Sequence, residues 1–129
     1  MLCAGLTRLL IIEDDPDVSD LLVSMLRRQG FCVSAAADGL SALELIKERS
    51  FDLLITDIRL PPPIDGLETV RLARERRPGL KSLFISGSGY YWGDPKRDDF
   101  VSKPFRGQEI VGCVWELLCR DSRRANDCG

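Results

Sequence analysis

The stretch that decides the fold is Phe51-Asp52-Leu53-Leu54-Ile55-Thr56-Asp57-Ile58-Arg59-Leu60-Pro61. It is an apolar run with β-branched residues in its centre, and it is short enough to be a strand that is buried on both faces. The run delivers one carboxylate, Asp57, at its end. Ligands of open parallel α/β sheets bind at the carboxyl ends of the strands. Asp57 is therefore the residue around which we expect a functional site.

The rest of the chain alternates short apolar runs with segments of helical periodicity. The runs predict strands at residues 9–12, 31–36, 51–57, 80–86 and 100–102, and the periodic segments predict helices at about 16–29, 41–49, 67–77 and 106–119. Val18, Leu21, Leu22, Met25 and Leu26 share one face of the first helix. Five strands alternating with helices indicate an α/β fold with a single, doubly wound, five-stranded parallel sheet.

The connection between the fourth and fifth predicted strands is unusual. Only thirteen residues separate Ser86 from Phe100, and they include three glycines and Pro95. Because glycine and proline are poor helix formers and a parallel crossover needs a dozen residues or more, we expect a fourth helix that is shortened or irregular. The rings of Tyr90, Tyr91 and Trp92 would cover sheet surface left bare by the missing helix, or form a docking patch for a partner.

The totals of the chain exclude several classes of protein. The 129 residues suffice for one domain, and the net charge of −2 leaves no basic surplus for nucleic acid or an anionic membrane. No signal peptide or membrane-spanning run is present, so we expect a cytoplasmic protein, with its five cysteines reduced because none has CxxC spacing. The chain has no histidine, which removes Ser-His-Asp catalysis and any role as a phosphohistidine donor.

Polar residues follow four of the predicted strands. Glu13 and Asp14 follow the first strand, Asp57 ends the third, Ser86 ends the fourth, and Lys103 follows the fifth. In the flavodoxin-like strand order 2-1-3-4-5 the first and third strands are neighbours, so the carboxylates of Asp14 and Asp57 would meet.

Such a cluster has a definite chemistry. Three acids in one cleft repel one another unless a cation lies among them, and carboxylate oxygens without soft ligands select Mg²⁺ or a similar ion. Ser86 offers a hydroxyl donor, and Lys103 offers a compact positive charge for a phosphoryl oxygen. These parts together predict an aspartyl-phosphate site in which Asp57 attacks a phosphoryl group.

Four segments, residues 11–15, 54–61, 85–87 and 100–105, resemble the sequence blocks of the receiver domain of two-component response regulators. The resemblance covers residues 7–119 and leaves 120–129 as a polar tail. It implies a protein that is not an enzyme in the usual sense but a phosphoacceptor that assists its own phosphoryl transfer and slow dephosphorylation. The donor it implies is a phosphohistidine on a sensor histidine kinase or a histidine phosphotransfer protein, with an unidentified downstream protein partner.

Carried over position by position, the resemblance assigns a role to each site residue. It implies that Asp57 is the phosphoacceptor, that Ser86 and Lys103 contact the phosphoryl group, and that Mg²⁺ is held by Asp14, Asp57, Glu13 through water, and the backbone carbonyl of Arg59. Ser86 and Phe100 match the switch positions, and Pro104 would follow a cis peptide bond. Asp15 falls outside the acidic pair and is expected at the start of a helix.

Two departures from the family and several alternatives remain at this level. The loop 61–66 is one residue longer than usual, and the short fourth crossover favours a phosphorelay role over transcriptional output. An enzyme of the haloacid dehalogenase type would need an aspartate where Arg59 stands, and an FMN binder would need a phosphate-cradling loop where Glu13 stands. The acids could be caps on an unrelated fold, or the chain could be a receiver-like interaction module that works without phosphorylation.

Overall fold

The structure, a computed structural model, describes residues 6–87 and 93–124. Strands and helices alternate along it as the sequence predicts. The strands are β1 (Arg8–Ile12), β2 (Cys32–Ala36), β3 (Leu53–Asp57), β4 (Lys81–Ser86) and β5 (Asp98–Ser102). The helices are α1 (Pro16–Arg28), α2 (Gly39–Glu48), α3 (Gly66–Arg76) and α4 (Gly107–Arg124).

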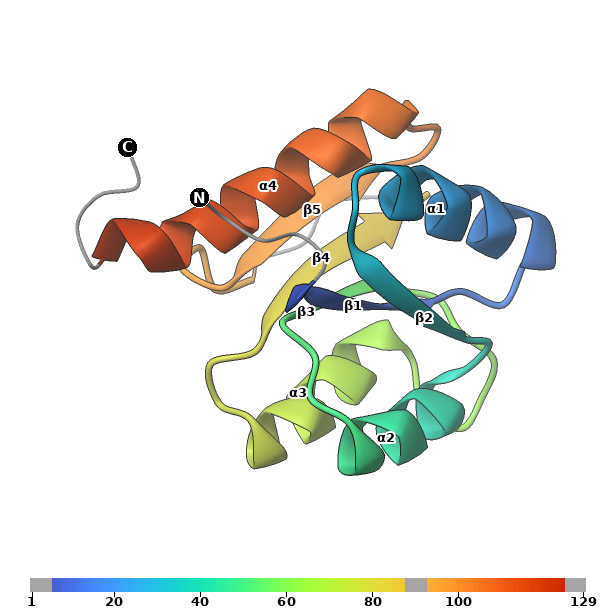
Figure 1. Cartoon of the computed structure of the whole chain (residues 1–129). Coiled ribbons are helices and arrows are strands. Elements are labelled where there is room, and N and C mark those ends of the chain that lie inside the picture. The colour runs from blue at the N-terminus through green and yellow to red at the C-terminus, as the bar shows by residue number, and fades with distance from the viewer. Residues whose placement is uncertain (1–5, 88–92, 125–129) are drawn as a thin grey trace.

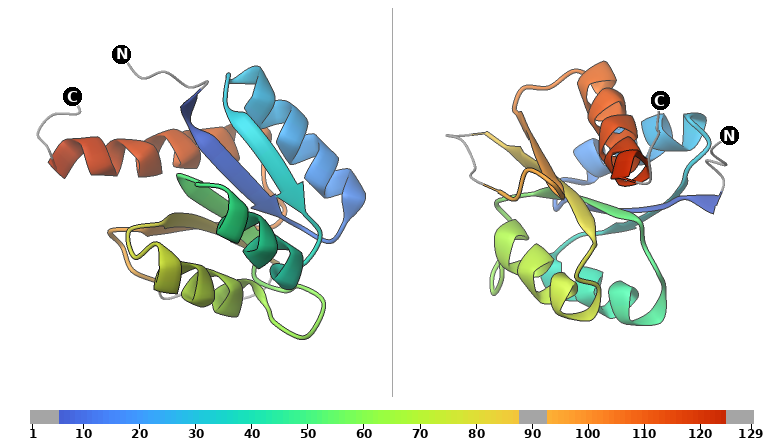
Figure 2. Two further views of the ribbon diagram at one scale, coloured as in Figure 1. Left: turned by 60° about the horizontal axis from the view of Figure 1, so that its bottom comes forward. Right: turned by 90° about the vertical axis from the view of Figure 1, so that its left-hand side faces the viewer.

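The five strands form one parallel sheet in the order β2-β1-β3-β4-β5, which confirms the predicted doubly wound topology. Helices α1 and α4 cover one face of the sheet, and α2 and α3 cover the other (Figure 1; Figure 2, right). The order of the strands reverses between β1 and β3, so their carboxyl ends form the switch point of the sheet.

The core consists of two apolar layers, one on each side of the sheet. Successive side chains of a strand point to opposite faces, so Leu9 and Ile11 of β1 pack with α1 and α4, whereas Leu10 and Ile12 pack with α2 and α3. All five residues of β3 are buried, including Asp57. The central strand thus carries its carboxylate out of a core that is packed on both faces.

Three helices begin at an aspartate. Asp15, Asp38 and Asp65 precede α1, α2 and α3, and each side chain accepts a hydrogen bond from a backbone N–H of the first turn. These caps satisfy donors that a helix start leaves open. Asp15 therefore has the helix-entry position that was expected of it. The exposed Leu21, by contrast, does not belong to the buried stripe of α1 predicted from its spacing.

The connection between β4 and β5 contains no helix in its described residues, which are Gly87 and 93–97. Strand β5 begins at Asp98, two residues before the predicted start, because a charged residue at this position is fully paired inside the protein. Its carboxylate accepts hydrogen bonds from Arg74 at 2.5 Å, Ser82 at 2.7 Å and the backbone N–H of Asp94 at 2.8 Å. Tyr90, Tyr91 and Trp92 lie outside the described residues.

Helix α4 continues to Arg124, beyond the helix end predicted at Cys119. Arg120 holds this end of the helix on the sheet, since its guanidinium donates to the carbonyls of Pro95 and Asp98 and lies 3.4 Å from the Asp99 carboxylate. Cys119 is disulfide-bonded, so the expectation of reduced thiols is wrong for this residue, whereas Cys32 and Cys113 are free. No helix in the described part of the chain is both long and apolar enough to cross a membrane.

Candidate functional site at the carboxyl edge of the sheet

The carboxyl ends of β3, β4 and β5 are held in register by backbone hydrogen bonds that continue past the strands. The N–H of Ile58 donates to the carbonyl of Ile85 at 2.9 Å, and the N–H of Lys103 donates to the carbonyl of Ser86 at 2.8 Å. Asp57 pairs in register with Ile85. Asp57, Ser86 and Lys103 are therefore brought to one edge by the sheet itself.

Asp57 and Lys103 form the central contact of this edge. The Lys103 Nζ lies 2.6 Å from Asp57 Oδ2, while the backbone N–H of Arg59 donates to Asp57 Oδ1 at 3.0 Å. The aspartate is buried with 6% of its surface exposed, and the lysine side chain is about a third exposed. The carboxylate is thus fixed by two donors and remains next to a cation that solvent can reach.

The charge of Lys103 is stabilised by the surrounding acids. Partial burial lowers the pKa of its ammonium, but the hydrogen bond and charge of Asp57, with the charges of Glu13 and Asp14, outweigh burial, and the pKa is raised. Lys103 therefore stays protonated over the whole physiological range and can face a phosphoryl oxygen as a fixed positive charge.

Glu13 is buried with 4% of its surface exposed, and its two oxygens differ. Oε2 accepts from the backbone N–H of Asp15 at 3.1 Å, but Oε1 is buried without a hydrogen-bond partner. Burial raises the pKa of Glu13; the charges of Asp57 and Asp14 raise it further, while the Asp15 N–H and Lys103 act against this rise. Asp14 is exposed at the mouth of the site.

These acids fit a hard cation in their chemistry. A buried carboxylate oxygen without a partner is costly, and here it belongs to an acid that is repelled by two others. A divalent ion with oxygen ligands would relieve both penalties. Among the described residues, however, no three acidic or cysteine side chains already surround a common point, so the side chains do not form a closed metal cage.

The remaining predicted residues lie close by. Ser86 is buried at the end of β4 and pairs in register with Ser102, the residue before Lys103. Phe100 is half-buried beside Phe84 and packs on the apolar layer under α2 and α3. The Lys103–Pro104 peptide bond is cis, and so is the Pro62–Pro63 bond, which sequence reasoning did not predict.

Two residues that hold Asp57 were missed in the sequence. Thr56 Oγ1 donates to the carbonyl of Asp57 at 2.9 Å, and Gly66 lies against the same carbonyl at the start of α3. The Asp65-Gly66 pair had indicated only a helix start. The glycine is visible in the sequence, but its contact with Asp57 is not. The two residues lie nine positions apart, and a pattern of residue types does not show that the loop between them folds back.

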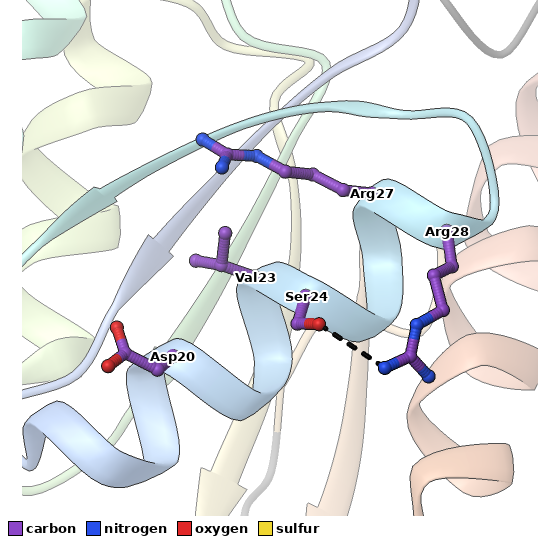
Figure 3. A pocket seen from close by; sticks show the side chains of 5 residues that line it. All are labelled: Asp20, Val23, Ser24, Arg27 and Arg28. Carbon is purple, nitrogen blue, oxygen red and sulfur yellow. Dashed lines mark hydrogen bonds between the residues drawn. The ribbon is translucent and has the colours of Figure 1, made fainter.

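A separate pocket lies along the outer face of α1, away from these residues. It is lined by Asp20, Val23, Ser24, Arg27 and Arg28, all from this one helix (Figure 3). Arg28 donates to Ser24 at 3.5 Å and Arg27 to the carbonyl of Val33 at 3.1 Å. None of the lining side chains is fully buried, so this pocket has no enclosed polar group that would make it a catalytic site.

The fold and the site define a class: an α/β protein with a doubly wound sheet that presents an acidic cluster and a lysine at its switch point. The sequence model described as the response regulator receiver domain matches residues 9–114. This chain belongs to that family, the receiver domains of two-component response regulators.

Comparison with individual proteins agrees with this assignment. The chain is 37% identical over 116 residues to the response regulator receiver protein CpdR of Brucella abortus, a match covering 86% of this chain and 96% of that protein. It spans about half the length of further curated relatives, such as the transcriptional regulatory protein CusR of Escherichia coli, to which it is 33% identical over 88% of its own length.

Solved structures show the same fold. A response regulator receiver protein from Sinorhizobium medicae superposes with a TM-score of 0.80 at 32% identity, over 87% of this chain and 94% of that chain. The response regulator TrrA of Thermotoga maritima, solved in complex with Mg²⁺–BeF, has a TM-score of 0.77 at 29% identity, over 87% and 99% of the two chains.

Proposed function

We propose that this protein is the phosphoacceptor of a two-component system or phosphorelay, with Asp57 as the residue that is phosphorylated. The observation that carries the proposal is the 2.6 Å contact between the Lys103 ammonium and the Asp57 carboxylate, made at the switch point of the sheet. Because this chain has no histidine, the phosphoryl group comes from another molecule. Membership of the receiver family supports a phosphohistidine on a sensor kinase or a phosphotransfer protein as that donor. The reaction takes place in the cytoplasm.

Phosphoryl transfer to Asp57 requires only a few protein groups. An oxygen of Asp57 forms a bond to phosphorus while the phosphorus–nitrogen bond of the donor breaks, and the imidazole leaves with the electron pair. Lys103 holds one oxygen of the phosphoryl group by its charge, and the Ser86 hydroxyl, at the end of the neighbouring strand, donates to another. The Arg59 N–H keeps the carboxylate directed out of the strand.

Mg²⁺ is the cofactor we propose, held by Asp14, Asp57 and the backbone carbonyl of Arg59, with Glu13 acting on it through water. When bound, the ion neutralises charge on the phosphoryl oxygens as transfer proceeds. The orphaned oxygen of Glu13 and the mutual repulsion of the three acids support this assignment.

Phosphorylation changes the affinity for a downstream protein. In this proposal Ser86 moves toward the phosphoryl group and the ring of Phe100 packs into the space that is vacated, which alters the surface around β5 and α4. Phe100 is half-buried next to Phe84, so its ring lies at the boundary between the core and the surface that would change. The domain that carries this switch comprises the expected residues 7–119 together with the last residues of α4, to Arg124.

The test is incubation with acetyl phosphate and Mg²⁺, followed by intact mass spectrometry. We expect the gain of one phosphoryl group that is stable to acid, labile to base, and absent in Asp57→Asn and in the presence of EDTA. Lys103→Met should fold and gain the group far more slowly. An unmodified wild-type protein, with a phosphorylated receiver domain as positive control, would instead favour the interaction module that works without phosphorylation.

A further inference from the structure

Gly66 lies closer to the backbone of Asp57 than any residue with a side chain could. A Cβ added to Gly66 would meet the carbonyl oxygen of Asp57 at 2.2 Å, its carbonyl carbon at 3.0 Å, and the Cα of Ile58 at 3.0 Å. All three neighbours are backbone atoms, which cannot rotate away as the end of a flexible side chain can. A larger residue at this position must therefore displace the end of β3 or the start of α3.

Hydrogen bonds hold both Gly66 and the Asp57 carbonyl in place, so neither can easily move away from the other. The Gly66 N–H donates to the carbonyl of Ile58 at 2.8 Å, and Asp65 caps the same turn by accepting from Glu68 at 2.8 Å. On the other side, the hydroxyl of Thr56 donates to the Asp57 carbonyl at 2.9 Å. The carbonyl of the acceptor residue is thus enclosed between a helix start and a side-chain donor.

We propose that Gly66 is a positioning residue for the phosphoacceptor. Because it has no side chain, the first turn of α3 can press against the Asp57 carbonyl and so set the direction in which the Asp57 carboxylate leaves the strand. That direction brings the carboxylate to both Lys103 and the N–H of Arg59. This inference rests on the proposed phosphoacceptor function, which it extends to a residue that does not touch the phosphoryl group.

The expected effect follows from the distances. A Cβ at Gly66 would have to move from 2.2 Å to at least 3.0 Å from the Asp57 oxygen, a displacement of 0.8 Å or more. Misplacing a reacting group by about 1 Å can cost roughly 100-fold in rate. Since the strand and the helix share the displacement, we expect Gly66→Ala to be phosphorylated at least about tenfold more slowly at saturating acetyl phosphate.

Two other glycines provide controls. Gly107→Ala introduces a close contact elsewhere in the fold, because its Cβ would meet Met25 Sδ at 2.4 Å, and it touches no atom of Asp57 or of α3. Gly79→Ala has no neighbour within 4 Å. If Gly66→Ala acts only by lowering stability, a Gly107→Ala protein that loses as much unfolding free energy should lose as much of its phosphorylation rate.

The experiment combines three measurements on the full chain: the phosphorylation rate from intact mass, the urea midpoint, and the Arg59 amide resonance in a ¹⁵N–¹H spectrum. The amide reports the Asp57 carboxylate directly, because it donates to Oδ1. We expect Gly66→Ala to slow phosphorylation and shift the Arg59 resonance, and both alanine controls to leave the resonance in place. A rate within twofold of wild type, or an unshifted resonance, overturns the proposal.

Thr56→Val keeps the proposal testable if Gly66→Ala does not fold, since it releases the same carbonyl from its other side and conserves volume. It should also shift the Arg59 resonance and slow phosphorylation, and the absence of both effects would overturn the proposal. If the wild-type protein takes up no phosphoryl group, the proposed function fails, but the Arg59 resonance still decides whether Gly66 positions Asp57.

Discussion

The two edges of the sheet both bury carboxylates, but they treat them differently. At the amino edge, Asp98 is 6% exposed and accepts hydrogen bonds from Arg74, Ser82 and the N–H of Asp94. At the carboxyl edge, Glu13 is equally buried, yet one of its oxygens has no partner. A fold tolerates a buried charge that is fully paired, whereas a buried charge left short of partners indicates a place for a ligand.

This comparison separates structure from function within one sheet. At the amino edge, polar contacts hold the start of β5, where Arg74 from α3 and Arg120 from α4 converge on its first residues. The carboxyl edge keeps acidic groups close together at a cost in stability. We expect substitutions at the two edges to have opposite effects on stability.

The largest effect is expected at the amino edge. Asp98→Ala leaves the guanidinium of Arg74, whose side chain is 14% exposed, without its carboxylate. Breaking a buried ion pair on one side should lower the free energy of unfolding by about 3 kcal/mol. Urea unfolding measures this loss, and phosphorylation under native conditions should continue. A loss below about 1 kcal/mol would show that this pair is not the anchor of β5.

A smaller effect of opposite sign is expected when Mg²⁺ is added. The ion should stabilise the wild-type protein by about 1.4 kcal/mol at a concentration ten times its dissociation constant, because it binds only the folded site. Asp14→Asn should lose this stabilisation, whereas Asp98→Ala should keep it. The measurement is the urea midpoint with and without Mg²⁺ at constant ionic strength. Equal stabilisation of wild type and Asp14→Asn would argue against a metal at this edge.

The smallest effect concerns the pH dependence contributed by Glu13 in the absence of metal. Because the pKa of Glu13 is raised in the folded protein, the unfolded chain ionises first, and stability falls as the pH rises from the unfolded value near 4.5 through the folded pKa. Glu13→Gln should therefore be more stable than wild type at neutral pH, by on the order of 1 kcal/mol. The two proteins should converge below the unfolded pKa.

Unfolding curves of both proteins between pH 4 and pH 8 in EDTA give the comparison. A wild-type protein that is more stable than Glu13→Gln at neutral pH would mean that the orphaned oxygen finds a partner in solution. In that case the contrast between the two edges would not extend to Glu13.

Much of the site could be predicted from the sequence because its residues follow strands. Asp57, Ser86 and Lys103 are each found at the end of an apolar run, and parallel strands bring such ends to one edge. The start of β5 at Asp98 could not be predicted in this way. Two acidic residues argue against a strand, and the arginine and serine that make the position possible are 24 and 16 residues away.

The end of α4 shows the same difficulty. Residues 120–124 are polar and suggested a tail, but they continue the helix, and Arg120 contacts a loop 25 residues earlier in the chain. Gly66 is a third case. It contacts Asp57 only because the loop between β3 and α3 folds back and brings the Gly66 N–H to the carbonyl of Ile58.

The sequence by itself determined the alternation of strands and helices and the identity of the polar groups at each strand end, because both depend only on local periodicity and composition. The tertiary structure alone decided that Lys103 contacts Asp57 across 46 residues, that Asp98 is fully paired, and that one oxygen of Glu13 is not. The physical reason is that hydrogen bonds and ion pairs act over a few ångströms, so their presence depends on which distant segments the packed core brings together.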